Sequence, residues 1–129
     1  MGDPRMMETA KALKQFASGF GCPAYTNSSV PDDVPLPYIV YPLTEPEWDQ
    51  KCSFYLLLWD RATGYANLLN RADQIVAEIG SRGAHIPIDG GYIHIWPETP
   101  LIQEQFDKEN NAKGIYINLS LSAYHMPGV

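Results

Sequence analysis

The C-terminal residues 115–124 constrain the fold most, because apolar side chains alternate strictly with polar or aromatic ones. The two alternating sets are Ile115, Ile117, Leu119, Leu121 and Ala123, and Tyr116, Asn118, Ser120, Ser122 and Tyr124. Successive side chains of an extended strand point to opposite faces of a sheet. The alternation therefore predicts a strand with one core face and one polar-aromatic face.

A second expected strand, residues 52–59, is apolar on both sides. Phe54, Leu56 and Leu58 fall on one face, and Tyr55, Leu57 and Trp59 fall on the other. Either this strand lies in the centre of a sheet that is covered on both faces, or its second face meets another protein subunit.

Three shorter strands and two helices complete the expected fold. Residues 38–41 predict one strand, and 84–88 and 92–96 predict a hairpin around Asp89-Gly90-Gly91, since glycine accepts the positive φ of tight turns. One helix is expected over about 4–18, with Asp3 and Pro4 at its start. A second helix is expected over the apolar stripe of 65–79, with Thr63 as N-cap and Gly80 beyond the end.

The order of these elements predicts an α+β fold in which a single, mostly antiparallel sheet of about five strands packs with two main helices. With 129 residues, the chain is expected to form a single domain over 1–129.

Two expected connections are unusually long for a small domain. Residues 22–37 contain four prolines, and residues 97–114 embed Leu101, Ile102 and Phe106 among Gln, Glu, Asp and Asn. Compact domains seldom keep such long connections unless they have a function.

Composition and charge exclude several classes of protein. Nine Lys and Arg against 15 Asp and Glu give a net charge of −6, which argues against binding through neutralised phosphates. No apolar run reaches the roughly 18 residues of a membrane span, and no signal peptide is visible. Cys22 and Cys52 could form at most one disulfide, so we expect reduced thiols in a cytosol-like compartment.

Catalytic and metal-binding motifs are absent from the sequence, and we expect no enzyme, no metal and no cofactor. His85 and His94 flank the expected hairpin and could approach each other, with Asp89 as a third ligand. An aromatic-polar surface row explains them more simply. The carboxylates of Glu45, Glu47, Asp49 and Asp60 are interpreted as solvated loop charges.

Aromatic and apolar side chains outside the expected core are the best candidates for a functional surface. Either the N-terminal helix covers the second face of the sheet, or both helices lie on one face and leave the other to neighbouring subunits. The candidate residues for contact with a subunit or partner are Tyr55, Leu57, Trp59, Tyr92, Trp96, Leu101, Ile102 and Phe106.

Segments along almost the whole chain, in this order, resemble the tail-terminator (tail-completion) proteins of long-tailed bacteriophages. The segments are residues 12–16, 20–25, 29–32, 36–41 (Leu-Pro-Tyr-Ile-Val-Tyr), 57–61 (Leu-Leu-Trp-Asp-Arg), 72–80, 86–91 (Ile-Pro-Ile-Asp-Gly-Gly), 99–103 and 114–119. The order and spacing of these segments carry the resemblance, since each is common by itself.

The resemblance implies a structural virion protein at the head–tail junction, assembled in the host cytoplasm. It implies a homo-oligomeric ring, expected to have six subunits, that caps the tail tube, stops tube polymerisation and docks the head connector or stopper protein. DNA is expected to pass through the ring without specific binding, which the net negative charge favours. The alternatives are another head-to-tail connector or stopper, expected to be a small β-barrel without a helix over 64–79, or a small-molecule binding module with a closed concavity.

Overall fold

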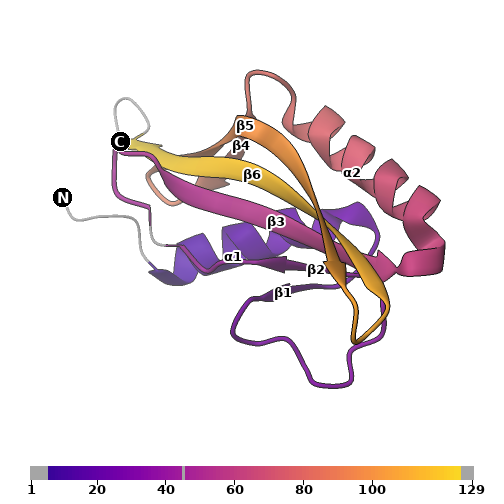
Figure 1. Ribbon diagram of the computed structural model, residues 1–129. Coiled ribbons are helices and arrows are strands. Elements are labelled where there is room, and N and C mark those ends of the chain that lie inside the picture. Colours follow the sequence, from indigo (N-terminus) through magenta and orange to yellow (C-terminus); the bar gives the residue numbers. More distant parts are fainter. Residues whose placement is uncertain (1–5, 45, 126–129) are drawn as a thin grey trace.

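The structure is a computed structural model that describes residues 6–44 and 46–125 (Figure 1). Within these residues, two α-helices, two short 3₁₀ turns and six strands follow one another. They are α1 (Met6–Ala17), η1 (Ser18–Phe20), β1 (Ala24–Thr26), β2 (Tyr38–Tyr41), β3 (Cys52–Arg61), η2 (Ala62–Gly64), α2 (Tyr65–Ile79), β4 (Ala84–Ile88), β5 (Gly91–Asp107) and β6 (Ala112–His125).

The six strands form one mixed sheet in the order β1-β2-β3-β6-β5-β4. All neighbours are antiparallel except β1 and β2, which are parallel. The fold is therefore α+β with two α-helices, as the sequence predicts, but the sheet has one strand more than the five expected.

The additional strand, β1, lies inside the proline-rich stretch that the sequence analysis treats as a connection. Ile39 N donates to Pro23 O at 2.9 Å, and Asn27 N donates to Tyr41 O at 2.9 Å, so backbone bonds hold both of its ends against β2. Three residues are too few to show an alternating pattern, which is why the sequence gives no signal for this strand.

Both helices pack on the same face of the sheet. Leu13 of α1 and Leu68 and Ile75 of α2 are fully buried in one cluster with sheet residues. The sheet contributes alternate residues of its central strands, including Phe54, Leu56, Leu58, Ile93, Ile95, Ile115, Ile117 and Leu121. The second of the two arrangements considered for the helices is the one observed, and the opposite face has no described helix over it.

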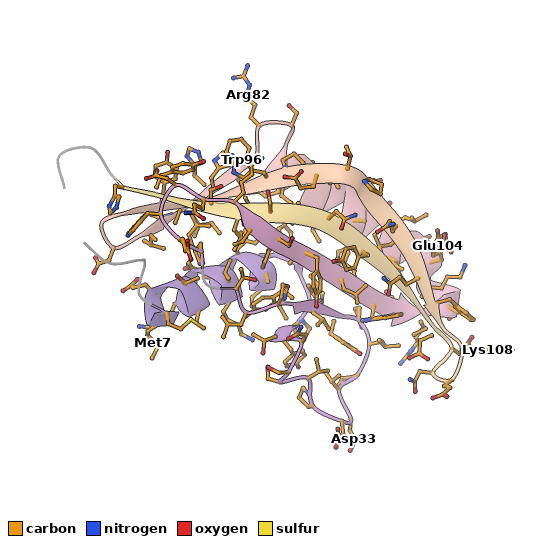
Figure 2. The ribbon with its side chains drawn as sticks, turned by 60° about the vertical axis from the view of Figure 1, so that its left-hand side comes forward. Met7, Asp33, Arg82, Trp96, Glu104 and Lys108 are labelled. Carbon is orange, nitrogen blue, oxygen red and sulfur yellow. The ribbon has the colours of Figure 1, made fainter. Side chains whose placement is uncertain are left out.

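Residues 97–114 are not the long excursion that the sequence analysis expects. Strand β5 continues to Asp107 and β6 begins at Ala112, so these residues form the outer part of one long hairpin with a turn at 108–111 (Figure 2). The pairing shifts between Pro97 and Ile102. Pro97 and Pro100 lack N–H donors, and exposed Gln and Glu side chains replace the usual alternation, so the strand is hidden in the sequence.

The predicted ends of α2 are right at one terminus and wrong at the other. Gly80 follows the last helical residue with φ 68°, and its N–H donates to Val76 O, as expected. The helix starts after η2 with Gly64 at the N-cap position and no capping side chain, so Thr63 is not the N-cap. Asp3 and Pro4, expected to start α1, lie outside the described residues. None of the helices in the described parts of the chain has the length and apolar character needed to cross a membrane.

Candidate functional site

The face of the sheet opposite the helices carries most of the predicted contact residues, and we call it the open face. Cross-strand register places Leu57 opposite Val40 and Tyr116, and Trp59 opposite Tyr38 and Gly114. On β5, Tyr92 lies opposite Tyr124 and Trp96 opposite Ser120. Tyr55, Leu57, Trp59, Tyr92 and Trp96 are all half-buried, although no described helix covers them.

One aromatic group on the open face centres on Trp59 and comes from β3 and β6. The rings of Tyr55 and Tyr116 are stacked with centroids 4.8 Å apart. A Cβ atom at Gly114 would lie 2.9 Å from the Trp59 ring, so only glycine lets that ring lie against β6. Burial, reinforced by Tyr55, raises the pKa of Tyr116. The group is a close-packed surface rather than a set of free side chains.

The second aromatic group centres on Trp96 and comes from β4 and β5. The His94 ring lies 3.9 Å from the Trp96 ring and 4.5 Å from the His85 ring, measured between centroids. The Nε2 atom of His94 is 2.7 Å from Arg82 O. Burial lowers the pKa of His94, and the Arg82 carbonyl opposes this shift.

Polar contacts fix the orientation of Trp96 and of the chain beside it. Trp96 Nε1 donates to Ser122 Oγ at 3.1 Å, and Lys51 Nζ lies 4.7 Å from the centre of the Trp96 ring. Glu98 accepts a hydrogen bond from Ser120 Oγ at 2.6 Å and pairs with Lys51 at 3.5 Å. The Ser120 bond lowers the pKa of Glu98, and Lys51 acts in the same direction.

A concavity of about 570 Å³ separates the two aromatic groups, next to the irregular pairing of β5. Its lining includes Lys51, Ser53, Glu98, Pro100 and Asn118. Asn118 Nδ2 donates to the carbonyl of Pro100 and, at 3.2 Å, to Gln103 Oε1. The open face is therefore two aromatic groups joined by a polar hollow, and the structure does not join the predicted residues into one patch.

The three candidates from residues 97–114 have different environments. Ile102 and Phe106 are 43% and 55% exposed, whereas Leu101 is half-buried and packs against the core cluster. Ile102 and Phe106 pair with Ile117 and Lys113, and Lys113 lies over the Tyr65 ring of α2. These two side chains therefore project on the helix side of the sheet and do not share the open face with Trp59 and Trp96.

In the part of the chain that the structure describes, the His, Cys, Asp and Glu side chains do not gather into a metal-binding centre. His85 and His94 do approach each other, as the hairpin register predicts, but no three His, Cys, Asp or Glu side chains in residues 6–44 and 46–125 are placed to hold a metal ion. Burial raises the pKa of both Cys22 and Cys52, which are not joined to each other, and a raised pKa favours the protonated thiol over the reactive thiolate.

One of the acidic residues that the sequence analysis interprets as solvated loop charges, Asp60, is buried in the structure. Asp60 is only 8% exposed, and its Oδ1 accepts a hydrogen bond from Arg61 N at 2.8 Å. Glu45 lies outside the described residues. The buried position of Asp60 follows from the register of β3, in which Phe54, Leu56, Leu58 and Asp60 share one face.

Sequence reasoning missed the polar residues that connect the two aromatic groups. Lys51, just before β3, pairs with Glu98 of β5, whose position depends on an irregularity in the β5–β6 pairing that the sequence does not reveal. The strict alternation of 115–124 predicts that Ser120 and Ser122 lie on the polar-aromatic face of the sheet. It does not predict which side chains they contact.

Comparison with known proteins gives no family assignment for the chain. No protein-family model matches the sequence, and no curated protein matches it. The motif order described above is therefore the basis for relating it to tail-terminator proteins.

Proposed function

We propose that the chain is a structural virion protein that forms a ring on the last ring of a phage tail tube. The ring, expected to have six subunits, ends tube polymerisation and provides the docking surface for the head connector. The observation that carries the proposal is the open face, where Tyr55, Leu57, Trp59, Tyr92 and Trp96 lie on a sheet face without a described helix.

Aromatic side chains that are held in place but left partly accessible favour a role in protein contacts. Aromatic residues are enriched at the centres of interfaces, where they bury large areas and lose little conformational entropy. The stacked pair Tyr55 and Tyr116 and the hydrogen-bonded Trp96 are already ordered before any partner arrives. Binding at this face would therefore cost less entropy than binding by free side chains.

A different head-to-tail connector or stopper is the first alternative. The small barrel expected for it would lack a packed helix over 64–79. Here α2 spans Tyr65–Ile79 and packs on the sheet through Leu68, Ala72, Ile75 and Ile79, which supports a terminator over a connector of that type.

Small-molecule binding is the second alternative, and the concavity of about 570 Å³ on the open face is the observation in its favour. Lys51, Glu98 and Asn118 supply charged and polar groups there. Their existing contacts with each other and with neighbouring strands, such as the Lys51–Glu98 pair, weaken this alternative.

The net charge of −6 suits a ring through which DNA passes. A channel lined by Lys and Arg would hold the phosphates, and each neutralised phosphate would add affinity. We propose that the assembled channel is not predominantly basic.

The test adds purified protein to tail tubes and measures tube length and end structure by negative-stain imaging, with mass measured by light scattering. We expect rings at tube ends and arrested growth. Leu57→Ser on the open face should reduce capping, whereas Leu69→Ser, which alters a 40%-exposed leucine on α2, should not. Protein that stays off the tube ends and leaves tube length unchanged would contradict the proposal.

A further inference from the structure

A polar cavity of about 400 Å³ lies between the end of β3, helix α2 and the residues before β2, and we call it the arginine cavity. Asp60 in its lining shares a face of β3 with the core residues, so the cavity is on the helix side of the sheet and not on the open face. The lining residues are Leu36, Pro37, Asp60, Arg61, Asn67, Asn70, Arg71 and Gln74. The contacts proposed for the open face use none of these residues.

One stripe of α2 forms the polar wall of the arginine cavity. Asn67, Asn70, Arg71 and Gln74 recur at spacings of three and four residues, so they lie on the same side of the helix. The three amides are exposed, and within the described residues their side chains have no hydrogen-bond partner. Because each amide carries both donors and an acceptor, such a row matches the N–H and C=O groups of a peptide backbone.

Asp60 is the buried charge of the arginine cavity. Its residue is 8% exposed, and its Oδ1 accepts a hydrogen bond from Arg61 N at 2.8 Å. Neither of the two ion pairs found in residues 6–44 and 46–125 includes this carboxylate. A carboxylate has roughly four acceptor sites, and a buried charge is costly unless it is paired. Asp60 therefore has acceptor sites left for a donor that enters the cavity.

Two guanidinium groups line the same cavity and are held differently. Arg71 Nε donates to Phe20 O at 3.2 Å, which orients this half-buried side chain and leaves its two terminal NH₂ groups to the cavity. Arg61 is exposed, and its guanidinium has neither a hydrogen bond nor an ion pair within the described residues. Two positive groups and the one negative charge of Asp60 give this cavity a net charge of +1, whereas the whole chain carries −6. The cavity is therefore suited to a ligand group with a single negative charge.

A second cavity of about 520 Å³ adjoins the arginine cavity, because Leu36 and Arg61 line both. Its other lining residues include the apolar and aromatic set Val30, Pro31, Val34 and Tyr38. Asp32 and Asp107 also line it, and Asp107 accepts a hydrogen bond from Asn110 Nδ2 at 2.7 Å. These carboxylates disfavour an anion in the second cavity, whereas its apolar side chains favour an apolar group. The two cavities together therefore match an elongated ligand with an acidic group at one end and an apolar group at the other.

We infer that the two cavities form a docking site for a peptide segment of a partner protein, in which an acidic residue lies beside an apolar one. The ligand carboxylate pairs with Arg61 and with the terminal NH₂ groups of Arg71, since guanidinium groups bind carboxylates through parallel hydrogen bonds. Backbone groups of the peptide pair with Asp60 and with the amides of α2, and the apolar side chain enters the second cavity. The charge of Asp60 opposes a doubly charged phosphate at this position. This inference goes beyond the proposed function, because it requires neither a ring nor a tail tube.

Short peptides test the charge requirement on the full chain. The probe is acetyl-Val-Asp-Val-amide, and matched peptides carry asparagine, lysine or phosphoserine at the middle position. NMR titrations that follow the backbone amides of α2 and the arginine Nε–H groups give the dissociation constants. The aspartate peptide is expected to bind at least about tenfold more tightly than the asparagine peptide, because the latter loses a charge-assisted pair with arginine. Acetyl-Val-Val, whose only carboxylate is its C-terminus, should bind more weakly than the aspartate peptide because it lacks backbone beyond the carboxylate for the amides of α2.

A variant of the exposed arginine separates the site from non-specific attraction. Arg61→Gln should remove the difference between the aspartate and asparagine peptides and leave thermal unfolding unchanged, since the altered side chain is exposed. Arg82→Gln, the matched change of an exposed arginine outside both cavities, should bind like the unaltered protein.

Several outcomes would overturn the inference. They are equal affinities for the aspartate and asparagine peptides, tighter binding of the lysine, phosphoserine or C-terminal carboxylate peptide, and a preference for aspartate that survives Arg61→Gln. Absence of any shift at peptide concentrations up to about 10 mM would overturn it as well. Capping of tail tubes is measured separately, so failure of this inference and failure of the proposed function are distinguishable.

Discussion

The two halves of β5 have similar hydrophobic residues but opposite environments. In the inner half, between β4 and β6, Ile93 and Ile95 are 0% exposed beneath the helices. In the outer half, which pairs with β6 and with no second strand among residues 6–44 and 46–125, Ile102 and Phe106 are 43% and 55% exposed. The apolar side chains of one continuous strand are therefore buried in the core at one end and exposed to solvent at the other.

Strand character therefore does not decide whether an apolar residue belongs to the core. The deciding factor is whether neighbouring elements reach that part of the strand. Strand β4 ends its pairing at Ile95, and beyond the irregular stretch Tyr65 at the start of α2 donates its hydroxyl to Glu104 Oε2 at 2.8 Å. The outer half is left with polar contacts and exposed apolar side chains.

The same substitution, isoleucine to alanine, should have very different effects on stability in the two halves of β5. Ile95→Ala should lower the free energy of unfolding by about 2–5 kcal/mol, because a fully buried side chain leaves a cavity. Ile102→Ala should change it by no more than about 0.5 kcal/mol, as for other exposed positions. Urea denaturation of both variants measures the two values. Equal losses would mean that the outer half is as much a part of the core as the inner half.

A smaller contrast lies within the outer region itself. Leu101→Asp should lower the free energy of unfolding by about 1–3 kcal/mol, since Leu101 packs against the core cluster and a charge there loses solvation. Phe106→Asp should leave stability within about 0.5 kcal/mol of the unaltered protein. Thermal unfolding at low protein concentration, where association contributes little, gives the comparison. A Phe106→Asp protein that unfolds would make Phe106 a core residue and remove it from the candidate contact residues.

How far the sequence predicts this molecule depends on the signal that each segment carries. In residues 115–124 the alternation continues over ten positions, so the sequence predicts which side chains face the core. In α2 the apolar stripe continues over four turns and predicts the buried side of the helix. The outer half of β5 shows neither, because its edge is solvated and Gln103, Glu104 and Gln105 follow one another without alternation. Prolines at 97 and 100 further suggest a loop where a strand with irregular pairing is observed.

The sequence predicts which residue types form the candidate site, but it does not predict how these residues are arranged. The sequence places Tyr55, Leu57 and Trp59 on one face of a strand. It cannot show that both helices pack on the opposite face, because their position depends on the packing of the whole core. The close approach of Trp59 to Gly114 and the contact of Lys51 with Glu98 depend on register between strands far apart in the chain. Such long-range pairing leaves no local pattern.

A weaker dependence of stability on pH is expected from the inner half of β5, where His94 is 7% exposed. Burial lowers the pKa of His94 below its ordinary value of 6.5, with smaller contributions from His85 and Lys51 in the same direction, while the bond to Arg82 O opposes the shift. The unfolded chain then binds a proton at His94 more readily than the folded chain. The free energy of unfolding should therefore fall as pH decreases through 6.5 and become independent of this group below the lowered pKa. His94→Gln should flatten this part of the profile, measured by urea denaturation between pH 8 and 5, and an unchanged slope would show that His94 is as accessible to protons as an exposed residue of the outer half.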